Sequence, residues 1–408
     1  MTGASGAQAG GRSVWTPARL RLWLGAAIVA AWLPLLGVPF RGWLDFAAFH
    51  AAGRLAFTPD VTSLRAVALL QAADGLPQTP FVYPAGLALL YAPFGALPYG
   101  LAAALHVALM ALALGAAAWF GAPLAGLPRR WALAGAFAWA PAAASVASGQ
   151  NATLALLLCV LAARALAAGQ PFRAGLWSGL LLYKPQLGAP LAGLAFLRGA
   201  WGMLGGIVVV GLLHYAAGVL ATGGRADWPL AWLATIRDYQ AADMAANGWQ
   251  AIGLPALGDR LAGVTGLPVL LAAGWVAGAA IVVACLPALR RLPPVPAVAL
   301  AAACGIVVGP HAWTYDATLL LPALAVLAGR VLRGETVGGT GALVLAWALA
   351  LAWPIGGLVG LTPLPLVVVA VPFALLGYGP FRQGTGGPAG PPGQPAPAAA
   401  GAGARAAR

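Results

Sequence analysis

Apolar runs long enough to cross a lipid bilayer recur along this sequence. Examples are Leu20–Pro39, Leu101–Ala122, Trp201–Ala221 and Pro268–Ala288, and a transmembrane helix needs about 20 predominantly apolar residues. Only 8% of the residues are charged and 61% are hydrophobic, whereas a soluble domain has roughly 25% charged residues. A soluble fold could not bury this much apolar surface. The sequence therefore predicts an all-α polytopic membrane protein.

The first apolar run predicts a transmembrane helix rather than a cleaved signal peptide. It follows Arg12, Arg19 and Arg21, it is long, and no small-residue cleavage site ends it. We expect it to stay in the protein as the first membrane-spanning helix.

The charge and the cysteines exclude two classes of function. The net charge of +13 comes from short arginine clusters between apolar runs, without interleaved aromatic residues, so nucleic acid is not an expected partner. Cys159, Cys285 and Cys304 lie in apolar runs without CxxC spacing. Neither a disulfide framework nor a zinc site is predicted.

The arginine clusters predict the topology, because cytoplasmic loops of membrane proteins are enriched in Lys and Arg. Placing the clusters inside puts the N-terminus in the cytoplasm and the loops 41–83 and 223–266 on the external side of the cell membrane. This parity needs about twelve crossings, some of them short. We expect residues 1–379 to form one membrane domain, with external helices lying in the membrane interface, and residues 380–408 to form a disordered cytoplasmic tail.

Few residues in this chain can carry out acid–base chemistry, since only nine are acidic and seven of these lie in the two external loops. Asp45 stands out because it follows the first helix directly, at the predicted membrane surface. A carboxylate there can meet both a lipid headgroup and water. The alternative is an interfacial Asp that only ends a helix.

Lys184 is the only lysine of the chain, and it lies in the apolar segment 180–187. A cation in an apolar helix costs about 2.5–3.5 kcal/mol on insertion scales unless it is paired or hydrated, and Lys is not equivalent to Arg at a phosphate. Lys184 is therefore a candidate functional residue. The alternative is a lysine that extends to the interface beside a proline kink.

Two further polar segments interrupt the apolar helices. Residues 148–151 offer the amides of Gln150 and Asn151 at a predicted helix start, where backbone N–H groups favour an anion. Residues 309–316 bring together His311, two aromatic residues and Asp316. The alternative for both segments is helix capping, with Asn151 and Asp316 as N-caps.

In this order along the chain, these segments resemble glycosyltransferase family 87, the polyprenol-phosphate-mannose-dependent mannosyltransferases of the GT-C class. The resemblance spans about Asp45 to Asp316. It rests on the following segments: Asp45, Phe81-Val-Tyr83-Pro84 with Ala92-Pro-Phe94, Gly149-Gln150-Asn151, Lys184-Pro-Gln186, and His311 to Asp316.

The resemblance implies a GT-C-like bundle and transfer of a sugar, most simply mannose, from a polyprenyl-phosphate donor to an acceptor hydroxyl at the external face, with inversion. The acceptor would be a glycolipid or another glycan. The sequence agrees, since it has no nucleotide-binding GxGxxG or P-loop pattern and no cytoplasmic segment long enough for a nucleotide-binding domain.

An inverting displacement needs one base for the acceptor hydroxyl and charge stabilisation for the leaving phosphate. We assign the base to Asp45. The donor site is assigned to the following residues: Lys184, Gln186, Gln150, Asn151, His311, Tyr83 and Asp316. No cofactor or resident metal is required, although a divalent cation that bridges Asp45 and the phosphate stays an open alternative.

Two other functional classes compete with the enzyme. In a transporter or lipid flippase, Lys184, Asp316 and the broken helices would form a substrate site at the middle of the membrane. The absence of an internal sequence repeat and the gathering of acidic residues in the external loops argue against it. A catalytically silent scaffold is the second alternative.

Overall fold

The computed structural model describes residues 17–33, 45–335 and 339–377. Within these ranges the chain is helical and forms no β-strand, apart from one antiparallel bridge between Ala251 and Trp313. The predicted all-α class is confirmed. The predicted tail at 380–408 and the residues directly before Asp45 lie outside the described ranges.

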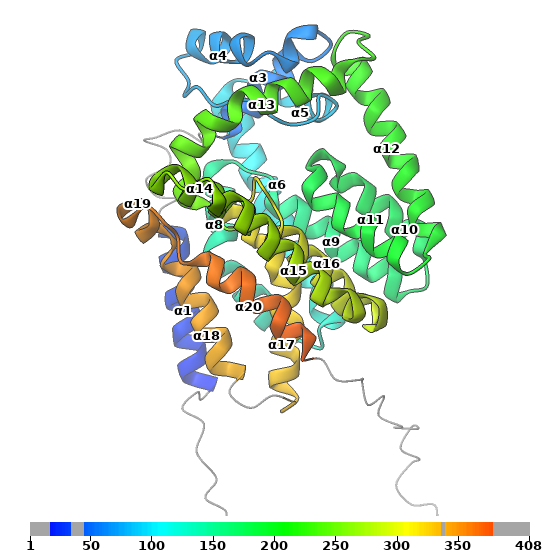
Figure 1. Cartoon of the computed structure of the whole chain (residues 1–408), viewed down its shortest axis with the longest axis vertical. Coiled ribbons are helices and arrows are strands. Elements are labelled where there is room, and N and C mark those ends of the chain that lie inside the picture. Colours follow the sequence, from blue (N-terminus) through cyan, green and yellow to red (C-terminus); the bar gives the residue numbers. More distant parts are fainter. Residues whose placement is uncertain (1–16, 34–44, 336–338, 378–408) are drawn as a thin grey trace, which may run out of the picture.

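Figure 1 shows two groups of helices. At one end lies an upper layer made of α3 (Phe46–Leu55), α4 (Leu64–Ala73), α5 (Leu87–Gly95) and α13 (Trp228–Asn247). Two short elements, η2 (Pro59–Thr62) and η4 (Gly248–Gln250), accompany it, and the 12-residue α14 (Leu254–Thr265) packs against α15 (Val269–Arg291). The upper layer is built from the two predicted external loops and from the segment 84–97, which holds only the nine-residue α5.

The remaining elements form the body of the molecule. They are α1 (Pro17–Trp32), α6 (Tyr99–Leu124), α7 (Arg129–Phe137), α8 (Ala140–Ser148), α9 (Ala152–Ala167), α10 (Pro171–Leu180), η3 (Leu181–Tyr183), α11 (Pro185–Leu197), α12 (Trp201–Ala221), α15 (Val269–Arg291), α16 (Pro294–Val307), η5 (Thr314–Leu320), α17 (Leu321–Leu332), α18 (Gly339–Leu351), η6 (Trp353–Ile355), α19 (Gly356–Val359) and α20 (Leu364–Leu376).

Four helical segments of the described chain are long and apolar enough to cross a membrane: Tyr99–Leu124, Trp201–Ala221, Val269–Arg291 and Thr314–Leu332. The number rises to six if the bent pairs α7–α8 and α18–α19 each form one span. Three of the four coincide with apolar runs named from the sequence. The protein is therefore a polytopic membrane protein, whereas the predicted count of about twelve spans is not reached by this criterion.

Breaks in the body helices explain the difference in count. Four apolar helices of the body, α9, α11, α16 and α20, are only 10–17 residues long. Proline stands at the start of α11 and α16, where it fits the first helical turn because the N–H it lacks would have no helical partner.

One of these breaks requires glycine. Gly149 ends α8 with φ +78°, in the left-handed region, and a Cβ atom there would lie 2.6 Å from the Cβ atom of Phe46. Only glycine satisfies both conditions at low cost. The chain can therefore turn from α8 into α9 directly against the first residue of α3, and Gln150 and Asn151 lie at this turn.

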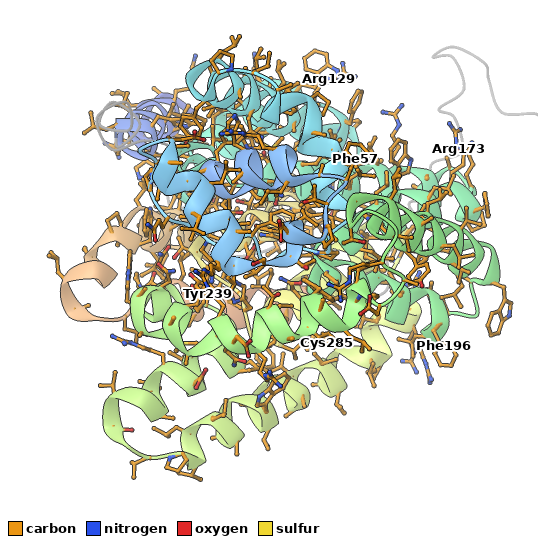
Figure 2. All side chains as sticks on the ribbon, turned by 90° about the horizontal axis from the view of Figure 1, so that it is seen from above. Phe57, Arg129, Arg173, Phe196, Tyr239 and Cys285 are labelled. Atoms are coloured by element: carbon orange, nitrogen blue, oxygen red, sulfur yellow. The ribbon has the colours of Figure 1, made fainter. Side chains whose placement is uncertain are left out.

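Hydrogen bonds join α13 to the rest of the upper layer. The Thr235 hydroxyl donates to the carbonyl oxygen of Thr62 at 2.8 Å, and the Trp232 indole donates to that of Val82 at 3.0 Å. Seen from above, α13 runs beside α3 and α4, and it carries Tyr239 (Figure 2). The two external segments, far apart in sequence, thus form one layer over the body.

Candidate functional site

Five chain segments bring polar side chains together beneath the upper layer. We call Asp45, Tyr83, Gln150, Lys184 and Asp316 the polar cluster. Asp45 precedes α3, Tyr83 precedes α5, Gln150 lies between α8 and α9, Lys184 lies between η3 and α11, and Asp316 lies in η5. Each therefore stands at or near a helix end, where a side chain can leave the regular packing of the bundle.

Lys184 and Asp316 form a buried ion pair. The Lys184 ammonium lies 3.1 Å from Oδ1 of Asp316, and the two side chains are only 5% and 2% exposed. The other carboxylate oxygen of Asp316 accepts a hydrogen bond from the backbone N–H of Trp313 at 3.1 Å. Buried charges of this kind are tolerated only when they are paired. The alternative of a lysine extending to the membrane interface is wrong, because Lys184 points into the protein.

Two aromatic rings also lie close to the Lys184 ammonium. Its Nζ lies 4.8 Å from the ring centroid of Tyr315 and 5.6 Å from that of Tyr83, within the range of cation–π attraction. An ammonium carries three donors, and Asp316 is the only hydrogen-bond acceptor found for it within the described residues. The group is held in place and can still donate to an anion.

Asp45 is held by the turn that follows α8. Its backbone N–H donates to the carbonyl oxygen of Ser148 at 3.0 Å, and its half-buried carboxyl group is hydrogen-bonded by the side chains of Gln150 and Ser148. Burial raises the pKa of Asp45 above its ordinary value, and these two hydrogen bonds together with the charge of Lys184 partly offset this effect. A carboxyl with a raised pKa is suited to accept a proton.

The contacts of Asp45 differ from those expected of a solvated residue that only ends the first helix, although the end of that helix lies outside the described residues. Asp45 stands at the start of α3 and makes no side-chain hydrogen bond to that helix. Its partners come instead from residues about one hundred positions later in the chain.

Tyr83 and Gln150 connect to Asp45. The Tyr83 hydroxyl donates to Oε1 of Gln150 at 2.8 Å, and this bond is buried. Because Oε1 is the acceptor for Tyr83, the amide nitrogen of Gln150 is the group that faces Asp45. Burial raises the pKa of Tyr83 well above its ordinary value, so Tyr83 stays protonated and fixes the orientation of this amide.

His311 lies next to a residue that the sequence did not single out, Asp243 of α13. His311 Nδ1 lies 3.2 Å from the Asp243 carboxylate, and the Trp313 indole donates to His311 Nε2 at 3.1 Å. Since Nε2 accepts, the proton of the neutral imidazole is on Nδ1 and faces Asp243. Burial lowers the pKa of His311, which favours this neutral form.

Asn247 anchors Asp243, since its side-chain amide donates to Oδ1 at 2.7 Å. Asp243 and Asn247 both lie on α13. The contact between Asp243 and His311 therefore links the upper layer to the segment that carries Asp316. In the sequence Asp243 was one of seven similar loop acids, and no local pattern distinguished it from the others.

The structure does not join Asn151 and Gln186 to the polar cluster. Asn151 is fully buried, and its carbonyl oxygen accepts from the Tyr183 hydroxyl at 3.0 Å. It occupies the N-cap position of α9 without a capping hydrogen bond, so the capping alternative is wrong for its side chain. Gln186 is half-buried in the first turn of α11, and its side chain has no hydrogen-bond partner in the described chain.

The capping alternative for Asp316 needs a correction as well. Asp316 is the third residue of η5 rather than its N-cap. It does bind the backbone N–H of Trp313 at the start of η5, but it also binds Lys184. Capping is therefore only part of what this carboxylate does.

The charges around the polar cluster distinguish its two carboxylates. Asp316 faces the Lys184 ammonium, whereas the side chains that hydrogen-bond to Asp45, those of Gln150 and Ser148, are neutral. Asp243, outside the polar cluster, faces the protonated nitrogen of the neutral His311 ring. Within the described ranges, no three His, Cys, Asp or Glu side chains gather in a way that could hold a metal ion.

The family model of glycosyltransferase family 87 matches residues 81–322 of this chain. The chain belongs to glycosyltransferase family 87. The match begins at Phe81 of the Phe81–Pro84 motif and extends past Asp316, whereas Asp45 lies before it. Neither the comparison with curated proteins nor that with solved structures gives a match. Membership in family 87 favours the enzyme over the transporter and the scaffold.

Proposed function

We propose that this glycosyltransferase moves mannose from a polyprenyl-phosphate donor to a hydroxyl group of a glycolipid or glycan acceptor, with inversion, at the external face of the cell membrane. One observation carries the proposal. A carboxylate with a raised pKa and a buried ammonium lie in the same polar cluster, within a bundle of apolar helices. These are the two groups that a displacement at a sugar phosphate needs.

In this reaction the Asp45 carboxylate accepts the proton of the acceptor hydroxyl. The oxygen attacks the anomeric carbon from the face opposite the phosphate, and the bond between that carbon and the phosphate oxygen breaks. The electron pair leaves with the polyprenyl phosphate. Lys184 donates to the phosphate oxygens as negative charge develops there.

The other members of the polar cluster position these two groups. Tyr83 orients Gln150, whose amide donates to Asp45. Asp316 holds the Lys184 ammonium in place. Asn151, Gln186 and His311 stay assigned to the donor or the acceptor as predictions.

Helix α6 supports the external placement of the site. Near its N-terminus, the Tyr99 ring packs against the ring of Phe46, the residue next to Asp45, with 5.7 Å between the ring centroids. Near its C-terminus, Arg129 and Arg164 lie over the rings of Trp119 and Phe120. Tyr99 and Trp119 are about 30 Å apart at 1.5 Å per residue, the thickness of the hydrocarbon core. With the arginines in the cytoplasm, the polar cluster faces outside.

The test uses the purified protein in nanodiscs with radiolabelled polyprenyl-phosphate-mannose and a lipid extract as the source of acceptors. Formation of a labelled glycosylated product that needs both the enzyme and the extract supports the proposal. Donor that stays intact, or product formed only from a nucleotide sugar, would refute the donor assignment. Membrane vesicles test the face of reaction, since donor confined to the cytoplasmic leaflet should give no product.

A further inference from the structure

A cavity lies at the opposite end of the molecule from the polar cluster. It has a volume of about 810 Å³ and is bounded by α1, α7, α17 and α18. Small-molecule sites typically measure roughly 300–1,000 Å³. Of these helices, α1, α17 and α18 lie at the lower end of the view in Figure 1, with α1 and α18 side by side. The cavity is therefore far from the proposed reaction and has no part in it.

The lining of this cavity is apolar with a basic component. Most of the lining residues are aliphatic, and three are tryptophans, Trp23, Trp131 and Trp347. Two arginines, Arg21 and Arg130, also line it, and no acidic residue does. Both arginines are exposed. The chemistry is that of an amphipathic ligand with an anionic head.

Neighbouring charges leave this basic character in place. The one acidic side chain in the described chain after Asp316 is Glu335, and it already pairs with Arg330 and Arg333. Arg130 has no ion pair within the described ranges. An anion that enters the cavity thus meets cationic side chains without a competing carboxylate on its walls.

We propose that this cavity binds an anionic membrane phospholipid, with the phosphate at Arg21 and Arg130 and the acyl chains against the apolar walls. Basic pockets between transmembrane helices on the cytoplasmic side bind anionic headgroups in general, and tryptophan is enriched at headgroup depth. The lipid joins α1 and α18 to α7 and α17. The proposal rests on the cavity alone and is independent of the proposed reaction, because neither arginine belongs to the polar cluster.

The test measures lipid retention by native mass spectrometry after the protein is released from nanodiscs of equimolar phosphatidylcholine and phosphatidylglycerol. The wild type should retain phosphatidylglycerol in preference to phosphatidylcholine. Arg21→Gln with Arg130→Gln should weaken retention of phosphatidylglycerol on the order of 30-fold, since each basic contact is lost. The matched control is Arg290→Gln with Arg291→Gln, which removes the same charge at exposed positions outside the cavity.

A second variant tests the apolar walls without changing charge. Gly135 lines the cavity, and a Cβ atom there would meet only the Trp347 ring at 3.7 Å, an ordinary contact. Gly135→Leu should therefore fold and fill part of the cavity, which lowers retention of phosphatidylglycerol. Equal retention by the two arginine double variants, or no preference for phosphatidylglycerol in the wild type, would overturn the proposal, as would full retention by Gly135→Leu.

Discussion

The ion pair between Lys184 and Asp316 allows the structural and the catalytic role of the lysine to be separated. Replacing Lys184 by Met leaves the Asp316 carboxylate, 2% exposed, without its counter-charge. Removing one partner of a buried pair typically costs about 3–5 kcal/mol, because the remaining charge stays buried. We therefore expect Lys184→Met to unfold at a clearly lower temperature than the wild type.

The double variant Lys184→Met with Asp316→Asn should regain most of this stability. Neither side chain is then charged, and the amide oxygen of the introduced asparagine can still accept from the backbone N–H of Trp313, as Asp316 does at 3.1 Å. Exchanging a buried pair for neutral groups is often close to neutral. Thermal unfolding of the four proteins of this mutant cycle in one detergent gives the coupling free energy directly.

Activity should not follow stability in this cycle. If Lys184 stabilises the leaving phosphate, the double variant lacks that donor however well it folds. Loss of one such donor costs on the order of 10²–10³ in rate. Initial rates with saturating polyprenyl-phosphate-mannose measure this. A stable double variant with turnover close to wild type would refute the catalytic role, and a double variant as unstable as Lys184→Met would refute the coupling.

Three further predictions concern Asp45 and the turn that holds it. Asp45→Asn should lower the rate by about 10²–10⁴ while donor binding is kept, as expected for loss of a general base. Product formation and donor binding by the purified variant measure this effect. Turnover within a few-fold of wild type would place the base elsewhere. Burial raises the pKa of Asp45 above 3.8, so kcat/KM should fall with decreasing pH at a midpoint above that value, because only the ionised carboxylate accepts a proton. A pH–rate profile with a midpoint at or below 3.8 would contradict the assignment. By the same shift, ionisation of Asp45 should lower the stability of the fold as the pH rises from 3.8 through the raised pKa. Gly149→Ala should destabilise the protein by more than the ~1–3 kcal/mol of left-handed strain, because the added Cβ atom also meets Phe46. In Gly169→Ala, at φ +69°, the added Cβ atom has nothing within 4 Å, so this variant should show the strain alone. Equal melting temperatures for the two alanine variants would contradict the proposed contact.

The sequence predicts the membrane class and most long spans because the bilayer imposes a simple length and composition rule. Runs such as Leu101–Ala122 and Trp201–Ala221 satisfy that rule without knowledge of any neighbour. The short helices α9, α11 and α16 do not satisfy it, and their boundaries depend on which protein surfaces cover them. The count of spans is therefore harder to predict than the class.

The details of the candidate site also depend on contacts between distant segments, which the sequence alone does not predict. Lys184 could be singled out because a cation in an apolar segment needs a partner. Its partner, however, lies 132 residues away along the chain. Hydropathy reports how apolar a segment is, but it does not report which residue packs opposite that segment. Helix capping was the alternative role for Asn151, at the start of α9. The Ser145 hydroxyl accepts from the backbone N–H of Ala152 at 3.3 Å instead, a contact that the α8–α9 turn brings about.

The ion pair also explains how a lysine can stay ready for a phosphate in apolar surroundings. A lone ammonium at such a depth would carry an uncompensated desolvation cost, because burial penalises the charge. Asp316 provides the counter-charge before the donor binds, while Trp313 and η5 hold Asp316 in place. In the proposed reaction, the remaining donors of the ammonium bind the phosphate and strengthen their bonds as its charge grows during cleavage. In the same proposal, Asp45, whose direct partners are neutral, takes the proton from the acceptor.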